Sequence, residues 1–263
     1  MESIPVRAKK SLGQHFLNDQ HIAMKIVGAL DEFAPSQVLE VGPGMGVLTR
    51  YLLQHPHRNC QFVEIDQESV EYLQVQFPEI RASIIQQDFL EFDFQAHYQE
   101  PVAVIGNFPY NISSQIFFKV LAYRELIPLV VGMVQKEVAE RISAPPGSKK
   151  YGILSVLLQA WYRIEYLFTV NENVFIPPPK VKSGVIRLVR NETRCLPCDE
   201  KLFTLLVKTA FNQRRKMLSN SLKGILGSVR GEHPLLTKRP EQLSVEEFVA
   251  LTLWHEQNRK EKD

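Results

Sequence analysis

The sequence predicts an α/β fold with a mostly parallel sheet and a smaller, all-α C-terminal subdomain. Two observations lead to this prediction. Short apolar runs alternate with helical patterns from about residue 38 to about residue 189, and strand signals stop after Asn191, where apolar residues recur at helical spacing. Alternating strands and helices are typical of parallel sheets joined by crossover helices. We therefore expect one domain over residues 1–190, beginning with a basic arm over 1–18, and a helical subdomain over 191–263.

The first strand is predicted over residues 38–41, and Gly-Pro-Gly-Met-Gly follows at 42–46, before a helix over 47–53. In this context glycines let the backbone approach a ligand closely. The spacing Gly-x-Gly-x-Gly differs from the Gly-x-Gly-x-x-Gly of dinucleotide-binding folds. It suits S-adenosylmethionine, which has no pyrophosphate to hold. We expect a Rossmann-like cofactor site at Gly42 and Gly44.

Acidic residues lie at the ends of the next two strands. The second strand, over residues 62–66, contains Glu64 about 20 residues beyond the glycine loop, where a carboxylate bonds ribose hydroxyls in dinucleotide-type folds. The third strand, over 83–87, ends at Asp88, whose carboxylate can accept a bond from the adenine amine of the cofactor. Open α/β sheets bind ligands at the carboxyl ends of their strands, so one pocket is expected to contain both acids.

The fourth strand ends in the tetrapeptide Asn107-Phe108-Pro109-Tyr110. This order suits methyl transfer to an exocyclic amine such as N6 of adenine, whose lone pair is delocalised into the ring. The Asn107 side chain and the Phe108 carbonyl can accept the two N–H groups and direct the lone pair at a methyl donor. Pro109 stiffens the turn, and Tyr110 offers a face for a flipped base. The simpler alternative is an ordinary turn, because Asn and Pro are common there.

Later segments continue the alternation and end it. The expected elements are a strand over 129–134, a helix beginning at 136–142, a flexible basic loop over 145–150, a helix over 152–161 and a last strand over 184–189.

Composition places the chain among globular proteins. Of its 263 residues, 44% are hydrophobic and 23% are charged, and no apolar run approaches the roughly 20 residues of a membrane span. The N-terminus has no signal-peptide layout, and three cysteines do not make a disulfide framework. A cytoplasmic protein is the simplest expectation. No metal site is expected, because Cys195 and Cys198 would need a second ligand pair that Cys60 alone does not supply.

The charge distribution favours a nucleic-acid partner more than the net charge of +2 does. Residues 64–100 carry nine acids and one base, whereas 141–164 carry four bases and 201–231 carry seven, both without an acid. This asymmetry suits a face that contacts a phosphate backbone, although most charge runs are solvated helix faces. The residues predicted to contact RNA are Lys9, Lys10, Arg141, Lys149, Lys150, Arg214, Arg215 and Lys216.

Motifs spread over nearly the whole chain resemble one enzyme family, the small-subunit ribosomal RNA adenine N6,N6-dimethyltransferases of the KsgA type. The matching segments are Lys10-x-x-Gly13-Gln14-His15-Phe16-Leu17, Glu40-Val41-Gly42-Pro43-Gly44-Met45-Gly46, Glu64-Ile65-Asp66, Gln87-Asp88, Gly106 to Ser113, Gln135 to Arg141, Phe175-x-Pro177-x-Pro179-x-Val181-x-Ser183 and Phe211-x-x-Arg214-Arg215-Lys216.

The resemblance implies roles for individual residues. His15, Leu17 and Gly42 would line the methionine end of S-adenosyl-L-methionine, and Asn107 would lie near the methyl donor. Glu64 would bind the ribose and Asp88 the adenine. It also implies transfer of two methyl groups to each of two adjacent adenosines in a hairpin near the 3′ end of small-subunit rRNA. The substrate would be an immature 30S-type subunit, with a role in assembly, and we expect a monomer without a membrane partner.

Two residues depart from the family pattern, and three rival functions remain. Position 15 is His where Asn is common, so its cofactor contact is expected through the backbone. Position 108 is Phe where Leu is usual, and the larger ring either alters the pocket or helps to hold the base.

The nearest rival function is that of a resistance methyltransferase acting on large-subunit rRNA. The others are a DNA adenine methyltransferase and a non-catalytic assembly factor or transcription-factor relative.

Overall fold

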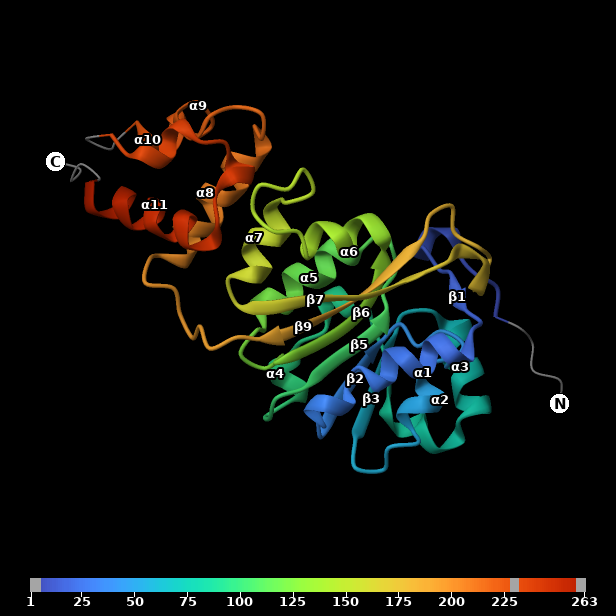
Figure 1. Cartoon of the computed structure of the whole chain (residues 1–263). Coiled ribbons are helices and arrows are strands. Elements are labelled where there is room, and N and C mark those ends of the chain that lie inside the picture. Colours follow the sequence, from blue (N-terminus) through green and yellow to red (C-terminus); the bar gives the residue numbers. More distant parts are fainter. Residues whose placement is uncertain (1–5, 228–231, 259–263) are drawn as a thin grey trace. The chain divides into compact units, whose positions relative to one another are not determined.

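The computed structural model describes residues 6–227 and 232–258 (Figure 1). Residues 1–5 of the predicted basic arm, and Arg230 of the basic run, lie outside the described residues. The chain forms two compact units, one of Met1–Ala139 with Ile164–Arg190 and one of Glu140–Arg163 with Asn191–Asp263. The last segment of the first unit ends at Arg190, which is the position of the expected boundary. The second unit also contains an earlier segment, which a linear change in composition does not reveal.

The described part of the first unit is organised around a seven-stranded sheet in the order β4-β3-β2-β5-β6-β9-β7. The strands are β2 (Gln37–Val41), β3 (Asn59–Glu64), β4 (Ile84–Gln86), β5 (Ala103–Asn107), β6 (Leu129–Gln135), β7 (Tyr162–Val170) and β9 (Ser183–Arg190). Neighbours from β4 to β6 are parallel, and β9 is antiparallel to β6. The chain moves outward from β2 to β4 and returns to β5, so β2 and β5 meet at a topological switch point, where α/β sheets bind ligands.

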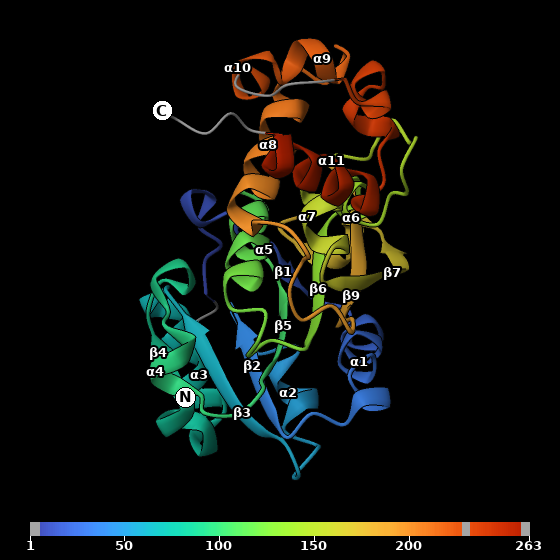
Figure 2. The same cartoon turned by 90° about the vertical axis from the view of Figure 1, so that its left-hand side faces the viewer.

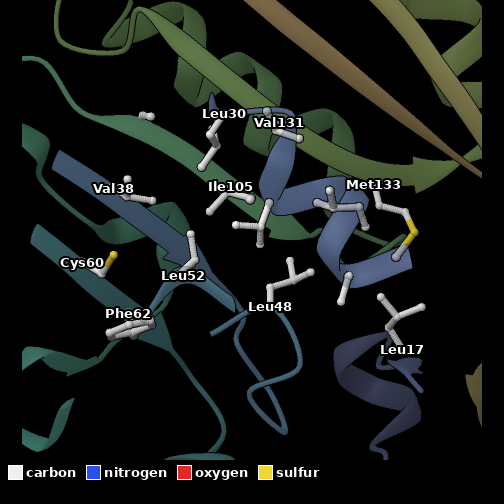
Figure 3. Close-up of a cluster of buried hydrophobic side chains, with 14 of the residues drawn as sticks. Leu17, Leu30, Val38, Leu48, Leu52, Cys60, Phe62, Ile105, Val131 and Met133 are labelled. Atoms are coloured by element: carbon white, nitrogen blue, oxygen red, sulfur yellow. The ribbon is translucent and has the colours of Figure 1, made fainter. Parts of the chain in front are cut away.

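Helices cover both faces of this sheet (Figures 1 and 2). They are α1 (Gln20–Gly28), α2 (Thr49–Leu52), α3 (Gln67–Gln76), α4 (Phe94–His97), α5 (Ser113–Ala122) and α6 (Lys136–Ile142). Figure 3 shows the core on the α1 side, where Leu52 of α2 packs with Val38, Ile105 and Val131 of the central strands. Because these strands are buried on both faces, they appear in the sequence as continuous apolar runs.

Observed elements agree with the expected ones, with shifts at their ends. Helix α2 is shorter than expected over 47–53, because residues up to Leu48 still belong to the turn that follows the glycines. Strand β3 ends at Glu64 rather than at Asp66, which precedes α3. Strand β7 was not expected as a separate element.

A two-stranded antiparallel sheet fixes the end of the N-terminal arm. Strand β1 (Phe16–Leu17) pairs with β8 (Phe175–Ile176), with Leu17 opposite Phe175. Both of these side chains are buried. The arm is thereby joined to the segment that leads from β7 to β9, about 160 residues away in the sequence.

The regular elements described after Asn191 are all helices, as expected. The second unit contains α7 (Ile153–Gln159), α8 (Glu200–Asn212), α9 (Leu218–Ser221), α10 (Lys223–Leu226) and α11 (Val245–Asn258). Helix α8 begins after Asp199, whose carboxylate accepts bonds from the N–H groups of Lys201 and Leu202. Phe203 and Phe248 form part of the buried core. No helix within residues 6–227 and 232–258 is long and apolar enough to cross a membrane.

Candidate active site

The carboxyl ends of β2, β3, β4 and β5 border one pocket in the first unit, with an empty volume of about 870 Å³ counted to its open mouth. Its wall contains the following residues predicted for the site: His15, Gly42, Gly44, Glu64, Asp88 and the tetrapeptide 107–110. The structure therefore brings together all the residues predicted for the cofactor and the target base except Leu17, and their individual roles remain predictions.

Two glycines of the loop are required for different reasons. Gly42 has a φ of 65°, and a Cβ built there would meet no atom within 4 Å, so the space beside it is open to a ligand. Gly44 has a φ of 55°, and a Cβ there would lie 2.9 Å from the Phe16 ring. The loop can therefore approach a bound group at Gly42 while Phe16 of the arm packs against Gly44.

Glu64 is held in place by the backbone. Its side chain is buried, and its two oxygens accept bonds from the N–H groups of Gly44 (3.0 Å) and Asp66 (2.9 Å). Burial raises the pKa of Glu64, and these two hydrogen bonds oppose that rise. Each oxygen keeps a lone pair that a ribose hydroxyl can use. Asp88 is fixed similarly, since its Oδ1 accepts the N–H of Leu90 at 2.8 Å.

A second buried acid near the glycine loop was not identified as a site residue from the sequence. Glu40 on β2 is 1% exposed and accepts the Thr49 hydroxyl at 2.6 Å. Burial raises the pKa of Glu40 to about 8, and the nearby Glu64 contributes to the rise. The sequence signal that could have identified Glu40 is an acidic residue inside an otherwise apolar strand. Glu40 borders a smaller hollow together with Leu17, Gly42 and Asn107, and this hollow is where the structure places Leu17.

The Asn107 amide is oriented by the arm. Its Nδ2 donates a hydrogen bond to the His15 carbonyl at 2.8 Å. With the nitrogen used in this way, Oδ1 is the acceptor that remains for a substrate N–H. His15 contributes its backbone carbonyl here, and the expected backbone contact with the cofactor remains a prediction.

The Phe108 ring lies in the core rather than against a substrate. Its side chain is 1% exposed and meets the Phe117 ring edge to face, with centroids 5.9 Å apart. A Cβ at Gly106 or Gly132 would approach this ring to within 3.0 Å, so these two glycines make the space that the ring occupies. Two effects were considered for Phe at position 108, a changed pocket or help in holding the target base. Because the ring is buried, it does not hold the base. No described residue donates a hydrogen bond to the Phe108 carbonyl, which leaves it as an acceptor.

Tyr110 is held by two other segments. Its hydroxyl bonds with Ser183 Oγ at 2.5 Å, and Ser183 is fully buried at the start of β9. Burial raises the pKa of Tyr110. The His15 ring lies beside the Tyr110 ring, with centroids 5.4 Å apart, and His15 Nδ1 bonds the Pro177 carbonyl at 2.8 Å. Sequence reasoning did not find these links.

Side chains also attach the arm to α3 and its N-terminus. Lys9 pairs with Asp66, and its Nζ lies 3.1 Å from a Glu68 carboxylate oxygen. Gln14 donates to the other Asp66 oxygen at 3.5 Å. These carboxylates raise the pKa of Lys9. The Lys9 charge is thus engaged within the protein, whereas Lys10 is exposed; contact of either with RNA remains a prediction.

The second unit joins two of the predicted RNA-contact segments. Arg214 donates to the Ser148 carbonyl at 3.1 Å, and the Gly147 N–H donates to the Glu241 carbonyl at 2.6 Å. The basic loop over 145–150 is thereby held beside the segment over 214–216. Among the residues of this unit predicted to contact RNA, the exposed ones are Arg141, Lys149, Lys150, Arg215 and Lys216. Lys150 pairs with Glu140 at 2.6 Å.

The three cysteines all lie among the described residues. Cys60 is buried, Cys195 is exposed and Cys198 is partly buried, and all three are free thiols. Within the described ranges, no three His, Cys, Asp or Glu side chains lie close enough together to hold a metal ion.

Comparison with known proteins identifies the family. The model of the ribosomal RNA adenine dimethylase family matches residues 6–253. A protein named ribosomal RNA small subunit methyltransferase A from Parabacteroides distasonis is 59% identical over 250 residues, covering 94% of each chain. The protein of the same name from Cytophaga hutchinsonii is 59% identical over 249 residues, covering 94% of this chain and 96% of its own.

Solved structures agree with this assignment. A dimethyladenosine transferase from Plasmodium falciparum superposes with a TM-score of 0.77 at 25% identity, covering 92% of this chain and 98% of its own. The 23S rRNA methyltransferase ErmE superposes with a TM-score of 0.67 at 25% identity, covering 90% of this chain and 99% of its own. The chain belongs to the ribosomal RNA adenine dimethylase family and is a methyltransferase that uses S-adenosylmethionine.

Proposed function

We propose that the chain transfers two methyl groups from S-adenosylmethionine to N6 of each of two adjacent adenosines in a 3′-terminal hairpin of small-subunit rRNA. The observation that supports this most directly is the orientation of Asn107. Its Nδ2 is used by the His15 carbonyl, so its Oδ1 is held as an acceptor at the edge of the pocket. A second acceptor, the Phe108 carbonyl, follows in the chain. Two acceptors match the two N–H groups of an adenine amine.

The pocket residues fit the cofactor. Gly42 provides open space for close approach, Glu64 has lone pairs for the ribose hydroxyls, and Asp88 can accept a bond from the adenine amine. When bound, S-adenosylmethionine supplies an electrophilic methyl group on a positively charged sulfur. The buried carboxylates and the backbone of the glycine loop hold the cofactor and need not take part in chemistry.

For the target base, the chain supplies orientation and electrostatic stabilisation. Tyr110 stacks on the flipped adenine, and its ring is held by Ser183 and flanked by His15. Asn107 Oδ1 and the Phe108 carbonyl bind N6 and stabilise the partial positive charge that develops there during transfer. A base before attack is unnecessary, because the amine loses its proton after the methyl group has arrived.

Similarity favours the small subunit as the substrate. The two relatives described above are 59% identical and carry a small-subunit name, whereas ErmE, whose title names 23S rRNA, is 25% identical. We further propose that the substrate is an immature 30S-type subunit and that the protein takes part in its assembly. In this proposal the protein is a cytoplasmic monomer without a membrane partner.

Binding of RNA or the ribosome is assigned to the second unit and the arm. The support is the joining of loop 145–150 to the segment 214–216, which gathers cations from distant parts of the sequence. Arginine and lysine near phosphates would give binding that falls steeply with salt.

The test is methyl transfer from radiolabelled S-adenosylmethionine to small subunits that lack the modification, with large subunits and naked rRNA alongside. Nucleoside analysis should find N6,N6-dimethyladenosine in the small subunits alone. Label in large-subunit RNA would overturn the proposed substrate. Tight binding to small subunits without label would indicate an assembly factor that has lost catalysis.

A further inference from the structure

The last residue of β8 and the segment that follows it as far as β9 expose apolar side chains beside cations. We call residues 176–182 the insertion loop. Ile176 is 59% exposed and Val181 is 44% exposed, which places both among the most exposed large apolar residues of the described chain. Lys180 and Lys182 are also exposed. Neither lysine makes an ion pair with any residue in the ranges that the structure describes.

Both ends of the insertion loop are fixed. Phe175 is 2% exposed and is paired with Leu17 across the β1–β8 sheet. At the other end, Ser183 is fully buried, and the Lys182 carbonyl accepts the N–H of Lys136 at 2.9 Å. Three consecutive prolines, at 177–179, stiffen the chain between them. A loop held in this way presents its apolar side chains without a large loss of conformational entropy on binding.

The insertion loop lies next to the residues proposed to hold the target base. The Pro177 carbonyl bonds His15, whose ring is beside Tyr110, and Ser183 bonds the Tyr110 hydroxyl. Two separate contacts thus connect this loop to the aromatic side chain that would stack on the adenine. The insertion loop is therefore adjacent to the residue that is proposed to stack on the target base.

We propose that the insertion loop is an RNA-contact surface that stabilises the flipped state of the substrate. Ile176 and Val181 enter the space in the base stack that the target adenosine leaves, and Lys180 and Lys182 bind the flanking phosphates. Unstacking a base costs a few kcal/mol per step, and apolar side chains inserted between bases offset that cost in other nucleic-acid complexes. This proposal rests on the proposed function, because it requires an adenosine within a structured RNA as the substrate.

The apolar part is tested with the double variant Ile176→Ala/Val181→Ala on small subunits that lack the modification. The expected result is a kcat about tenfold lower at saturating cofactor and subunits, with the Kd for S-adenosylmethionine unchanged. Ile176→Leu/Val181→Leu, which keeps apolar bulk, should restore most of kcat. Val75→Ala is the matched control, because Val75 is 61% exposed on α3 and lies outside the pocket wall. Thermal unfolding of each variant verifies that the fold is retained.

The cationic part is tested with Lys180→Gln/Lys182→Gln, with Lys25→Gln on α1 as the control. Weaker binding to small subunits is expected. The slope of log affinity against log salt should fall by about one for each phosphate that the variant no longer neutralises.

Each result decides a separate point. An unchanged kcat in the double alanine variant, or a leucine variant as defective as the alanine variant, would overturn insertion into the stack. An unchanged salt slope in the lysine variant would overturn the phosphate contacts. If the unaltered protein fails to methylate small subunits, the proposed function fails first, so the two failures are distinguishable.

Discussion

The two sides of the pocket are held by different kinds of contact. On the cofactor side, Glu64 accepts from Gly44, 20 positions away, and Asp88 accepts from Leu90, two positions away. On the substrate side, Asn107 bonds a residue 92 positions away and Tyr110 one 73 positions away. The two carboxylates proposed to bind the cofactor are therefore held by backbone groups at most 20 positions away, although the arm also packs against the loop at Gly44. The substrate side exists only after distant segments have come together.

This difference suggests how each side responds to substitution. Backbone donors such as the Gly44 N–H persist when a neighbouring side chain is changed, so the cofactor side should lose affinity gradually. The substrate side depends on single side chains that bridge segments, such as Asn107 and Ser183. We expect the largest losses there, and in turnover rather than in cofactor binding.

The substitution with the largest expected effect is Asn107→Ala. Removing one fixed polar group that stabilises developing charge costs about 100- to 1,000-fold in kcat in other enzymes. The Kd for S-adenosylmethionine should remain nearly unchanged, which calorimetric titration would measure beside single-turnover transfer. Asn59→Ala, at the opposite end of the sheet, is the control. Near-normal turnover by Asn107→Ala would refute its assignment as the acceptor.

Tyr110→Ala should have the next largest effect. Base–aromatic stacking contributes about 1–3 kcal/mol per base, so a loss of roughly tenfold to a hundredfold in kcat/KM is expected. Tyr110→Phe and Ser183→Ala should each lose only a few-fold, because both keep the ring and remove one hydrogen bond. Tyr72→Ala on α3 is the control. Equal losses in the Phe and Ala variants would show that the hydroxyl matters rather than the ring.

Glu64→Gln should weaken cofactor binding by about tenfold, since hydrogen bonds to a charged group contribute about 1.5–3 kcal/mol. The amide of the variant would also place an NH₂ group against the N–H of either Gly44 or Asp66. Because both groups are donors, one hydrogen bond would be lost. Equilibrium dialysis with labelled S-adenosylmethionine measures the change, and kcat at saturating cofactor should fall much less. Glu71→Gln, on the exposed face of α3, serves as the reference variant. A fall in kcat without a change in Kd would contradict the division of the pocket into two sides.

The last prediction concerns stability rather than activity, and is a pH dependence of unfolding that arises from Glu40. Its folded-state pKa, raised by burial to about 8, exceeds that of the unfolded chain, so its contribution is fully present below the unfolded value and is lost as pH rises through about 8. Between about pH 5 and 8, the unaltered protein should lose up to ~1.4 kcal/mol of unfolding free energy per pH unit relative to Glu40→Gln. Urea unfolding of both proteins at several pH values measures the difference. Parallel pH profiles would contradict this account.

Much of the cofactor side could be predicted from the sequence, because its signals are local. Gly42, Glu64 and Asp88 each follow or end an apolar run, and parallel strands bring such ends to one edge. The position of Asn107 could be predicted for the same reason.

The contacts that fix the substrate side had no comparable signal. The link from His15 to Pro177 depends on the pairing of β1 with β8, two strands of two residues each. Periodicity cannot be read in segments so short. The engagement of Lys9 by Asp66 and Glu68 was missed for a related reason, since a cation in a basic arm is indistinguishable from one that contacts RNA until its neighbours are known.

The packing of Phe108 constrains the order in which this site can change over evolutionary time. The ring fits only because Gly106 and Gly132 carry no side chain. Gly106 is needed in any case, because a Cβ there would also lie 2.5 Å from the Val41 carbonyl oxygen. Gly132 is different, since the nearest atoms to a Cβ there all belong to the Phe108 ring. An ancestor with Leu at position 108 would therefore need glycine at position 132 before it gained Phe, and Gly132 can gain a methyl group only after the ring has left.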